Sequence, residues 1–190
     1  MSGRRLVRES VPLLLAMLLL VAWPAWGKHE FRVEKADTRV ADGTLIMDAR
    51  IDYAFSDVAL EALDNGVPLT LEVHVQVRRS DSWVWEESVI DQRLRYRIRY
   101  KPLSERFLVS RLPEAGGRSY VTRDAAVAAL GEIEGLQLAK VSQLEPGEEY
   151  EIHLQASLDV EELPLPLKPI AYLLPSWKLS TGWTKWPLRP

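Results

Sequence analysis

The chain has no cysteine and only three histidines among its 190 residues. The lack of cysteine excludes disulfide bonds, thiol nucleophiles, thiolate metal ligands and a lipid-modified N-terminal cysteine. The sequence also lacks the Gly-x-Ser-x-Gly elbow found in many serine hydrolases and a glycine-rich loop for a phosphate group. We therefore predict no cofactor and no metal site, assign no catalytic residue, and expect that the protein is not an enzyme.

Two of the three histidines leave one metal hypothesis open. His74 and His153 each occupy the polar face of an alternating segment, so they would approach each other if the two segments were neighbouring strands. A zinc site would also need a carboxylate, from Glu72 or Glu151. The alternative is that both imidazoles are solvated, as histidines on exposed strand faces usually are.

The N-terminus has the pattern of an export signal. Arg4, Arg5 and Arg8 precede an uncharged, leucine-rich run over residues 10–27, and small residues stand at the positions that a signal peptidase recognises. We predict a signal peptide over residues 1–27, cleavage after Gly27, and a periplasmic or secreted protein. The alternative is an uncleaved anchor at the inner membrane, because the run is at the short end of the roughly 17–25 residues that cross a bilayer.

Residues 28–190 are long enough for one domain and show no linker or repeat. The first 27 residues hold three of the 24 basic and one of the 27 acidic residues, so the remainder carries a net charge of about −5. This charge argues against a nucleic-acid partner.

The best-specified segment covers residues 56–78. Ser56 is the predicted N-cap of a short helix, which ends at Gly66 and is followed by Pro68. From Leu69 the apolar and polar residues then alternate, as they do in a strand with one buried face.

Seven other segments have a strand pattern, and a second helix is predicted after Thr122, with a frayed end marked by Gly131 and Gly135. The eight predicted strands cover residues 28–40, 45–53, 69–78, 83–90, 93–101, 107–112, 136–141 and 150–158. Those between Leu69 and Leu112 are expected to form an antiparallel meander. Because each strand needs one buried face, we predict a mainly β protein, an antiparallel β-sandwich of immunoglobulin-like architecture with two short helices.

The most unusual polar feature is a ladder of cations on one face of a strand. The cationic ladder consists of Arg93, Arg95, Arg97, Arg99 and Lys101. Side chains on one face of a strand are about 6.6 Å apart, so unpaired cations would repel one another. Either acids on neighbouring strands, such as Glu72, Glu86 or Glu87, neutralise the ladder, or it binds an anionic partner.

The C-terminal region is rich in proline and tryptophan. The sequence LPLPLKP over residues 163–169 favours an extended or polyproline conformation. Three tryptophans follow, and they either close one end of the core or form an exposed aromatic surface for glycans or lipid headgroups: Trp177, Trp183 and Trp186.

Several separated motifs, in order, resemble a known family. The motifs are LDNGVPL (63–69), RYRIRYKPLSERFLV (95–109), AALGEIEGLQL (128–138), LPLPLKP (163–169) and WKLSTGWTKW (177–186). Together with the signal peptide they resemble the proteobacterial domain of unknown function 4390. The resemblance implies a small exported protein without an established activity or cofactor. It also implies a link to a membrane sensor histidine kinase, because members are often encoded beside one.

The functional expectation is therefore an exported, non-catalytic binding or accessory module with an envelope protein or an anionic envelope component as its partner. Residues 1–27 could also bring the protein close to a membrane. Two alternatives stay open: a hydrolase of envelope polymers with unidentified carboxylates, and a structural subunit held at the membrane by an uncleaved anchor.

Overall fold

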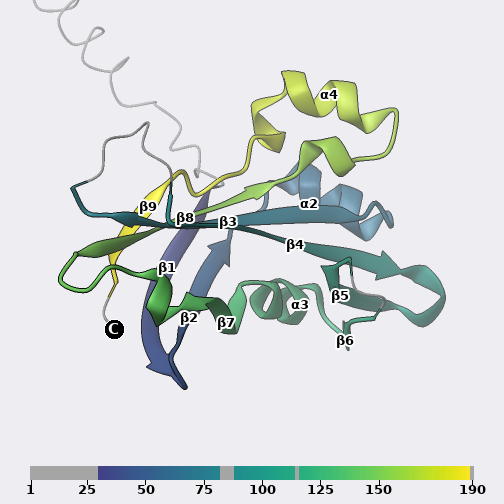
Figure 1. The fold of residues 1–190 in the computed structure, drawn as a ribbon. Coiled ribbons are helices and arrows are strands. Elements are labelled where there is room, and N and C mark those ends of the chain that lie inside the picture. The colour runs from purple at the N-terminus through teal and green to yellow at the C-terminus, as the bar shows by residue number, and fades with distance from the viewer. Residues whose placement is uncertain (1–29, 82–87, 114–115, 189–190) are drawn as a thin grey trace, which may run out of the picture.

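The computed structural model describes residues 30–81, 88–113 and 116–188, and these residues form two antiparallel sheets and several short helices (Figure 1). The smaller sheet has the order β1-β2-β7: Phe31–Ala41, Thr44–Tyr53 and Glu132–Lys140. The larger sheet has the order β6-β5-β4-β3-β8-β9: Arg118–Tyr120, Arg106–Leu112, Ile90–Lys101, Leu69–Arg79, Tyr150–Leu158 and Thr184–Pro187.

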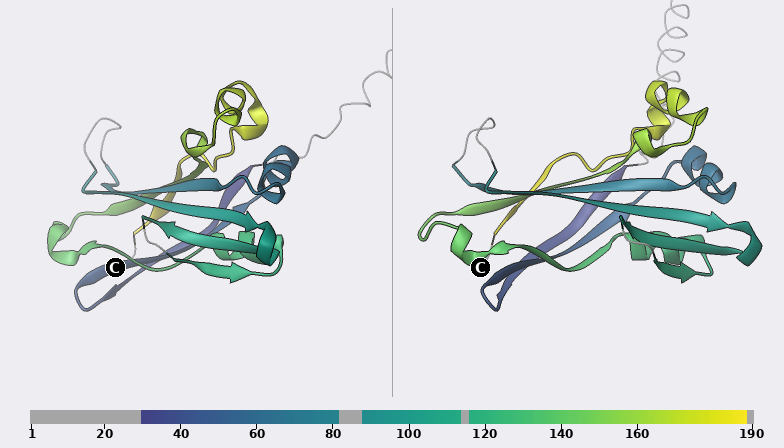
Figure 2. Two further views of the ribbon diagram at one scale, coloured as in Figure 1. Left: turned by 90° about the vertical axis from the view of Figure 1, so that its right-hand side faces the viewer. Right: turned by 45° about the vertical axis from the view of Figure 1, so that its right-hand side comes forward.

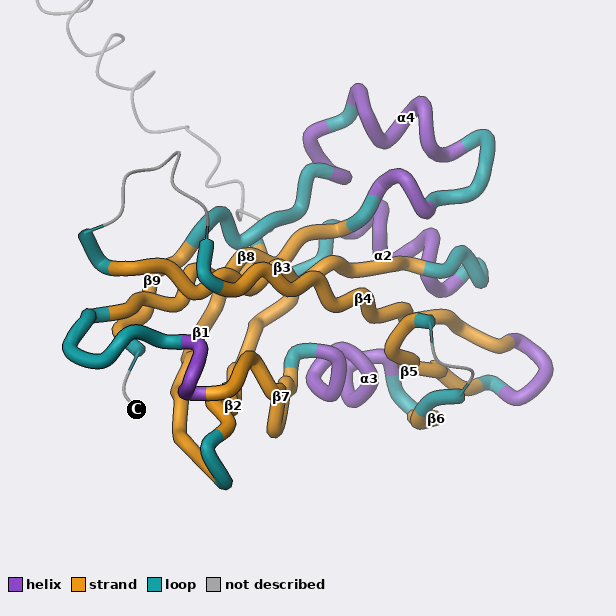
Figure 3. Tube along the Cα trace, in the orientation of Figure 1, coloured by secondary structure: helices purple, strands orange, loops and turns teal. Residues whose placement is uncertain are grey.

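The described part of the chain contains three α-helices, one more than the sequence predicts (Figure 3). They are α2 (Asp57–Asp64), α3 (Arg123–Leu130) and α4 (Leu167–Leu173). Four single turns of 3-10 helix accompany them: η1 (Pro102–Ser104), η2 (Val141–Gln143), η3 (Val160–Glu162) and η4 (Pro175–Trp177). No helix in these residues is long and apolar enough to cross a membrane.

The predicted corner between the first helix and the central strand is confirmed. The Ser56 side chain accepts a hydrogen bond from the backbone N–H of Ala59, which caps α2. Gly66 then adopts a φ of 85°, a conformation that costs glycine little, and Pro68 prevents the helix from continuing. Strand β3 follows, with β4 on one side and β8 on the other.

The predicted meander is confirmed for β3, β4 and β5, which pair consecutively and antiparallel. Of the separate strand expected over residues 83–90, most lies outside the described residues, and Ile90 already belongs to β4. The chain then turns through η1 into β5, and the short strand β6 follows, which is not among the predicted strands.

The second helix starts at its predicted cap, because the Thr122 side chain accepts a hydrogen bond from the backbone N–H of Ala125. It does not fray towards Gly135 as expected. It ends at Gly131, and β7 begins at once. A Cβ atom on Gly131 would stand 2.0 Å from the carbonyl oxygen of Ile51, so only glycine allows β2 to approach this closely.

The extended conformation expected for residues 163–169 is wrong at its C-terminal half, where α4 begins. Pro166 precedes the helix and Pro169 lies in its first turn. A proline is tolerated there because the first backbone N–H groups of a helix have no partner within the helix.

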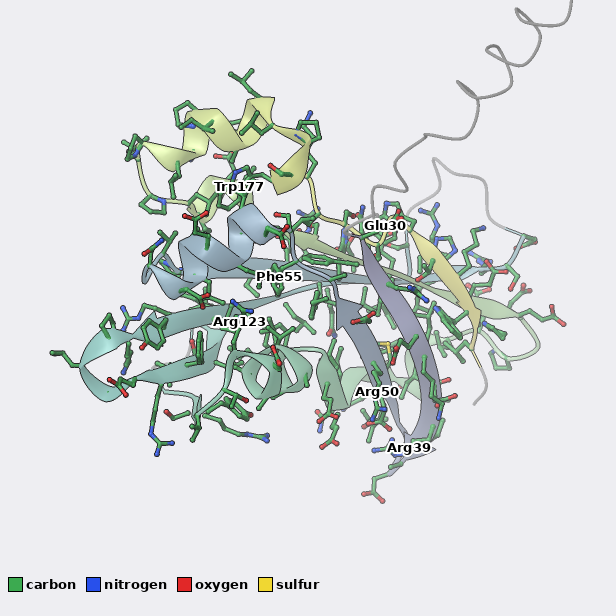
Figure 4. The ribbon with its side chains drawn as sticks, turned by 180° about the vertical axis from the view of Figure 1, so that it is seen from behind. Glu30, Arg39, Arg50, Phe55, Arg123 and Trp177 are labelled. Carbon is green, nitrogen blue, oxygen red and sulfur yellow. The ribbon has the colours of Figure 1, made fainter. Side chains whose placement is uncertain are left out.

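Buried side chains from both sheets form one core cluster, to which α2 and α3 each contribute two residues. Between these two helices, Arg123 Nη1 lies 2.6 Å from Asp64 Oδ2 (Figure 4). The segment with η3, α4 and η4 projects from the same end of the molecule as α2 (Figure 2). The buried ring of Trp177 lies at its base, as the label in Figure 4 shows.

Candidate functional site

The outer face of the large sheet carries the polar residues that the sequence singled out. In β3, β4 and β8 one set of alternating side chains is buried in the core and the other set faces outward. The cationic ladder belongs to the outward set of β4, because Leu94 and Ile98 between its members are buried. Strand pairing brings Thr70, Glu72 and His74 of β3 beside it.

Carboxylates neutralise the first three arginines of the ladder. Arg93 Nη1 lies 3.5 Å from Glu72 Oε1. Arg95 pairs with Glu162 and lies 3.7 Å from Asp159 Oδ2. Arg97 Nη2 lies 2.9 Å from the other oxygen of Glu162, and its Nε donates a hydrogen bond of 3.2 Å to Thr70 Oγ1.

Two of these carboxylates were not predicted. Glu72 lies on the adjacent strand, as expected, whereas Glu86 and Glu87 lie outside the described residues. Asp159 and Glu162 come from the turn after β8, far along the chain, and only the pairing of β8 with β3 brings them over β4. Nothing in the local sequence pattern indicated this approach.

The far end of the ladder is different. Arg99 and Lys101 are exposed and form no ion pair with any described residue. Lys101 stands directly opposite a third exposed cation, Arg106 of β5. We call Arg99, Lys101 and Arg106 the cationic tip. The turn between them carries Leu103, whose side chain is fully exposed. The tip is thus a small basic surface in which like charges face each other across two strands, an unfavourable arrangement in isolation.

A hydrogen-bonded network occupies the outer face beyond Arg93. Asp91 Oδ1 lies 2.8 Å from His74 Nε2, and Asp91 Oδ2 accepts a 2.8 Å hydrogen bond from Gln76 Nε2. Partial burial would raise the pKa of Asp91, but these hydrogen bonds and the positive charges of His74 and Arg93 outweigh it and lower the pKa below its usual value. Asp91 is therefore a carboxylate and suits structural or binding roles better than proton donation.

The two strand histidines lie on the same face of neighbouring strands but are not opposite each other. His74 is opposite Gln155, and His153 is opposite Gln76. Each has its own carboxylate, since His153 Nε2 lies 3.3 Å from Glu151 Oε2. Among the residues that the structure describes, no group of three or more histidines and carboxylates is arranged to hold a metal ion.

Burial is the main cause of a lowered pKa at His153. Lys185 and Arg78 lower it further, and together these effects outweigh the hydrogen bond and the negative charge of Glu151. His153 is therefore mostly neutral at pH 7.

The three C-terminal tryptophans do not form one aromatic surface. Trp177 is only 1% exposed and closes the core beside α2, so it is not part of any surface. Trp186 is half-buried in β9, and its Nε1 donates a 3.3 Å hydrogen bond to Thr184 Oγ1. Trp183 alone is exposed, and its ring lies edge-on to the ring of His74 with centroids 4.9 Å apart.

A cavity of about 450 Å³ that the sequence did not indicate opens between β5, β6 and β7. Arg111 and Arg118 line one wall, and Glu132 and Glu134 line the other. It lies away from the outer face, so the cationic ladder and this cavity are separate features. Its charges come from three strands, β5, β6 and β7, and only the two glutamates of β7 are close in sequence.

No curated protein and no solved structure matches the chain. The model of one family does match, over residues 28–187, so it covers β1 to β9 and every residue of the cationic ladder. The resemblance noted in the sequence is thereby confirmed, and the chain belongs to the family described as the domain of unknown function DUF4390.

Proposed function

We propose that the protein is an exported, non-catalytic binding module of the proteobacterial envelope, whose cationic tip binds an acidic segment of another envelope protein. The observation that carries the proposal is the contrast within one strand. Arg93, Arg95 and Arg97 have carboxylate partners, whereas the tip has none among the described residues.

The geometry of the tip supports an extended ligand. Arg99 and Lys101 project from the same face of β4, about 6.6 Å apart, and Lys101 and Arg106 face each other across the strand pair. An extended peptide repeats its side chains with the same spacing, so acids at alternate positions would meet both cations of β4. Such a peptide would also relieve the repulsion between Lys101 and Arg106.

The neutralised part of the ladder supplies rigidity. Glu162 joins Arg95 and Arg97, and the central strand pairs on both sides over most of its length. The tip therefore extends from a fixed framework, which reduces the entropy lost on binding.

The location and architecture are part of the same proposal. We propose a signal peptide over residues 1–27, cleavage after Gly27 and a periplasmic site of action. The start of the family match at residue 28 and of β1 at Phe31 supports this boundary. The shared core of the two antiparallel sheets supports a β-sandwich of immunoglobulin-like architecture. A membrane sensor kinase is the first partner to test.

The test uses a labelled peptide with glutamate at every second position and measures binding by fluorescence anisotropy. The variant carries Arg99→Gln, Lys101→Gln and Arg106→Gln. The control carries Arg32→Gln, Lys140→Gln and Lys178→Gln, which removes the same charge from exposed positions elsewhere. We expect at least a tenfold loss of affinity in the tip variant and less than a twofold change in the control.

A second measurement connects the peptide to a natural partner. The tagged wild-type protein is used to capture proteins from an envelope extract, and the captured proteins are quantified for the wild type, the tip variant and the control. We expect an acidic protein that the tip variant alone fails to retain. Equal peptide affinity in all three proteins, or identical captured sets, would contradict the proposal.

A further inference from the structure

The segment around α4 exposes more apolar surface than its surroundings. Residues 163–177 contain one charged side chain, Lys168. Of the eleven large hydrophobic side chains that are exposed in the described chain, five lie inside this segment, between residues 165 and 174. We call these five the apolar patch: Leu165 (79% exposed), Ile170 (46%), Tyr172 (47%), Leu173 (80%) and Leu174 (43%).

The apolar patch is held in a defined shape. Leu163 before the helix, Ala171 within it and Trp177 after it are all buried, so the segment is attached to the core at three points. Proline residues further restrict the backbone on both sides of the helix. The exposure of the patch therefore belongs to an ordered part of the fold, and packing among the described residues does not cover it.

The three carboxylates that precede the patch in the chain, Asp159, Glu161 and Glu162, are paired. Glu161 Oε2 lies 2.7 Å from Lys168 Nζ, while Glu162 and Asp159 pair with arginines of the cationic ladder. An unpaired anion at the rim would oppose contact with a lipid surface, and these pairs remove that obstacle. Tyr172 adds an amphipathic ring of the kind that is common at membrane interfaces.

The start of the described chain lies on the same side of the molecule. Glu30 is near the side from which α4 projects, whereas Arg39 is at the far end of the β1–β2 hairpin (Figure 4). The uncharged run over residues 10–27 ends three residues before Glu30, a distance of about 10 Å at most. Before the proposed cleavage after Gly27, a signal peptide in the bilayer would hold the side of the domain that carries Glu30 and α4 towards the membrane surface.

We infer that the apolar patch rests on a phospholipid bilayer, with the leucine side chains at the boundary between headgroups and acyl chains. The contact goes beyond the proposed binding of an acidic segment, because the patch and the cationic tip share no residue. In this arrangement α4 orients the domain on the membrane.

The absence of cysteine gives a direct test. The protein is purified after export, so that its N-terminus is the one produced in the cell. Each variant carries a single cysteine, Leu165→Cys, Leu173→Cys or Val40→Cys, which is labelled with an environment-sensitive fluorophore. Val40 is a matched control because it is 40% exposed but lies beside Arg39, at the end remote from α4. Each protein is mixed with phosphatidylcholine vesicles, whose lack of net charge removes any attraction by the cationic tip.

We expect a blue shift at residues 165 and 173, at least twofold stronger quenching there by lipids with a nitroxide on the acyl chain, and no change at residue 40. Circular dichroism checks that each variant is folded. Equal spectra with and without vesicles at residues 165 and 173 would overturn the inference. A blue-shifted spectrum at residues 165 and 173 in the absence of vesicles, relative to residue 40, would also overturn it. A blue shift that grows with protein concentration would indicate that a second copy covers the patch. A blue shift that is independent of concentration would indicate that the chain's own N-terminal segment covers it.

Discussion

Helices α2 and α4 lie at the same end of the molecule and have nearly the same length, but they are stabilised differently. Helix α2 has a side-chain cap from Ser56, an acid in its first turn and two fully buried residues, Ala59 and Leu63. Helix α4 has no side-chain cap and one buried residue, Ala171, and it exposes most of its apolar surface.

The difference shows which parts of the sequence serve folding alone. The buried apolar residues of α2 contribute to the core, so their role is to stabilise the fold of this chain. The exposed apolar residues in and beside α4 contribute little to that stability and would lower solubility, which is consistent with the inferred contact outside the chain.

The largest expected effect compares one leucine from each helix. Leu63→Ala should destabilise the protein by about 2–5 kcal/mol, because a fully buried side chain leaves a cavity. Leu173→Ala should change the free energy of unfolding by less than about 0.5 kcal/mol, because its side chain is 80% exposed. Urea unfolding followed by tryptophan fluorescence measures both. Similar losses in the two variants would show that α4 contributes to stability as α2 does.

The second test removes the side-chain cap of α2, a feature that α4 does not have. Ser56→Ala should cost about 1–2 kcal/mol, since the Ser56 hydroxyl accepts from Ala59 N–H and donates a 2.7 Å hydrogen bond to the carbonyl of Ser176. Ser176→Ala is the control, because that residue contributes its backbone oxygen to the bond. The same unfolding measurement applies, and a Ser56 loss no larger than the control loss would contradict the assigned cap.

A smaller effect concerns the charges that hold the turn before α4. Glu162→Gln should cost about 0.5–1 kcal/mol, because it removes the partner that Arg95 and Arg97 share. Glu161→Gln should cost less, since it breaks only the pair with Lys168. The Glu162 loss should shrink in 1 M salt because salt screens charges. A loss that is independent of salt would mean that packing, not charge, holds the turn.

The smallest expected effect is the change of stability with pH. It arises in the sheet, because His153 lies in β8 and neither α2 nor α4 contains a histidine. The pKa of His153 is lower in the folded than in the unfolded protein, so unfolded chains bind more protons below about pH 6.5. Stability should therefore fall as pH decreases from 7 through the folded pKa.

The His153→Gln variant should lose stability less steeply over this range than the wild type. Glu151, Lys185 and Arg78 are the charged groups that face His153, and they remain in both proteins. Unfolding midpoints at pH 7, 6 and 5 give the two slopes. Parallel curves would show that His153 does not contribute to the pH dependence.

Local patterns were sufficient for much of the fold. The alternation in β3 and β8 places their apolar residues in the core, and both predicted caps, Ser56 and Thr122, accept the expected hydrogen bonds. These features depend on neighbours in sequence, so a single sequence reveals them. Strand β9 was missed because its four residues are too few to show a period.

The parts that failed depend on long-range contacts. The helix at Leu167 follows two prolines, and its formation requires the core contacts of Ala171 and Trp177. The partners of Arg95 and Arg97 come from a turn that only the β3–β8 pairing brings near. The ladder itself was visible in the sequence, but the division between its neutralised part and the cationic tip was not.

The central position of β3 also sets an order for assembly during synthesis. Strands β3, β4 and β5 can pair as soon as they are made, but the second neighbour of β3 begins only at Tyr150. The small sheet is likewise complete only after β7 has been made and pairs with β2. A nascent chain that ends before Tyr150 therefore leaves an open edge on β3, with unpaired backbone groups beside an apolar face. Such an edge is a template for aggregation, so the addition of β8 protects the chain from self-association.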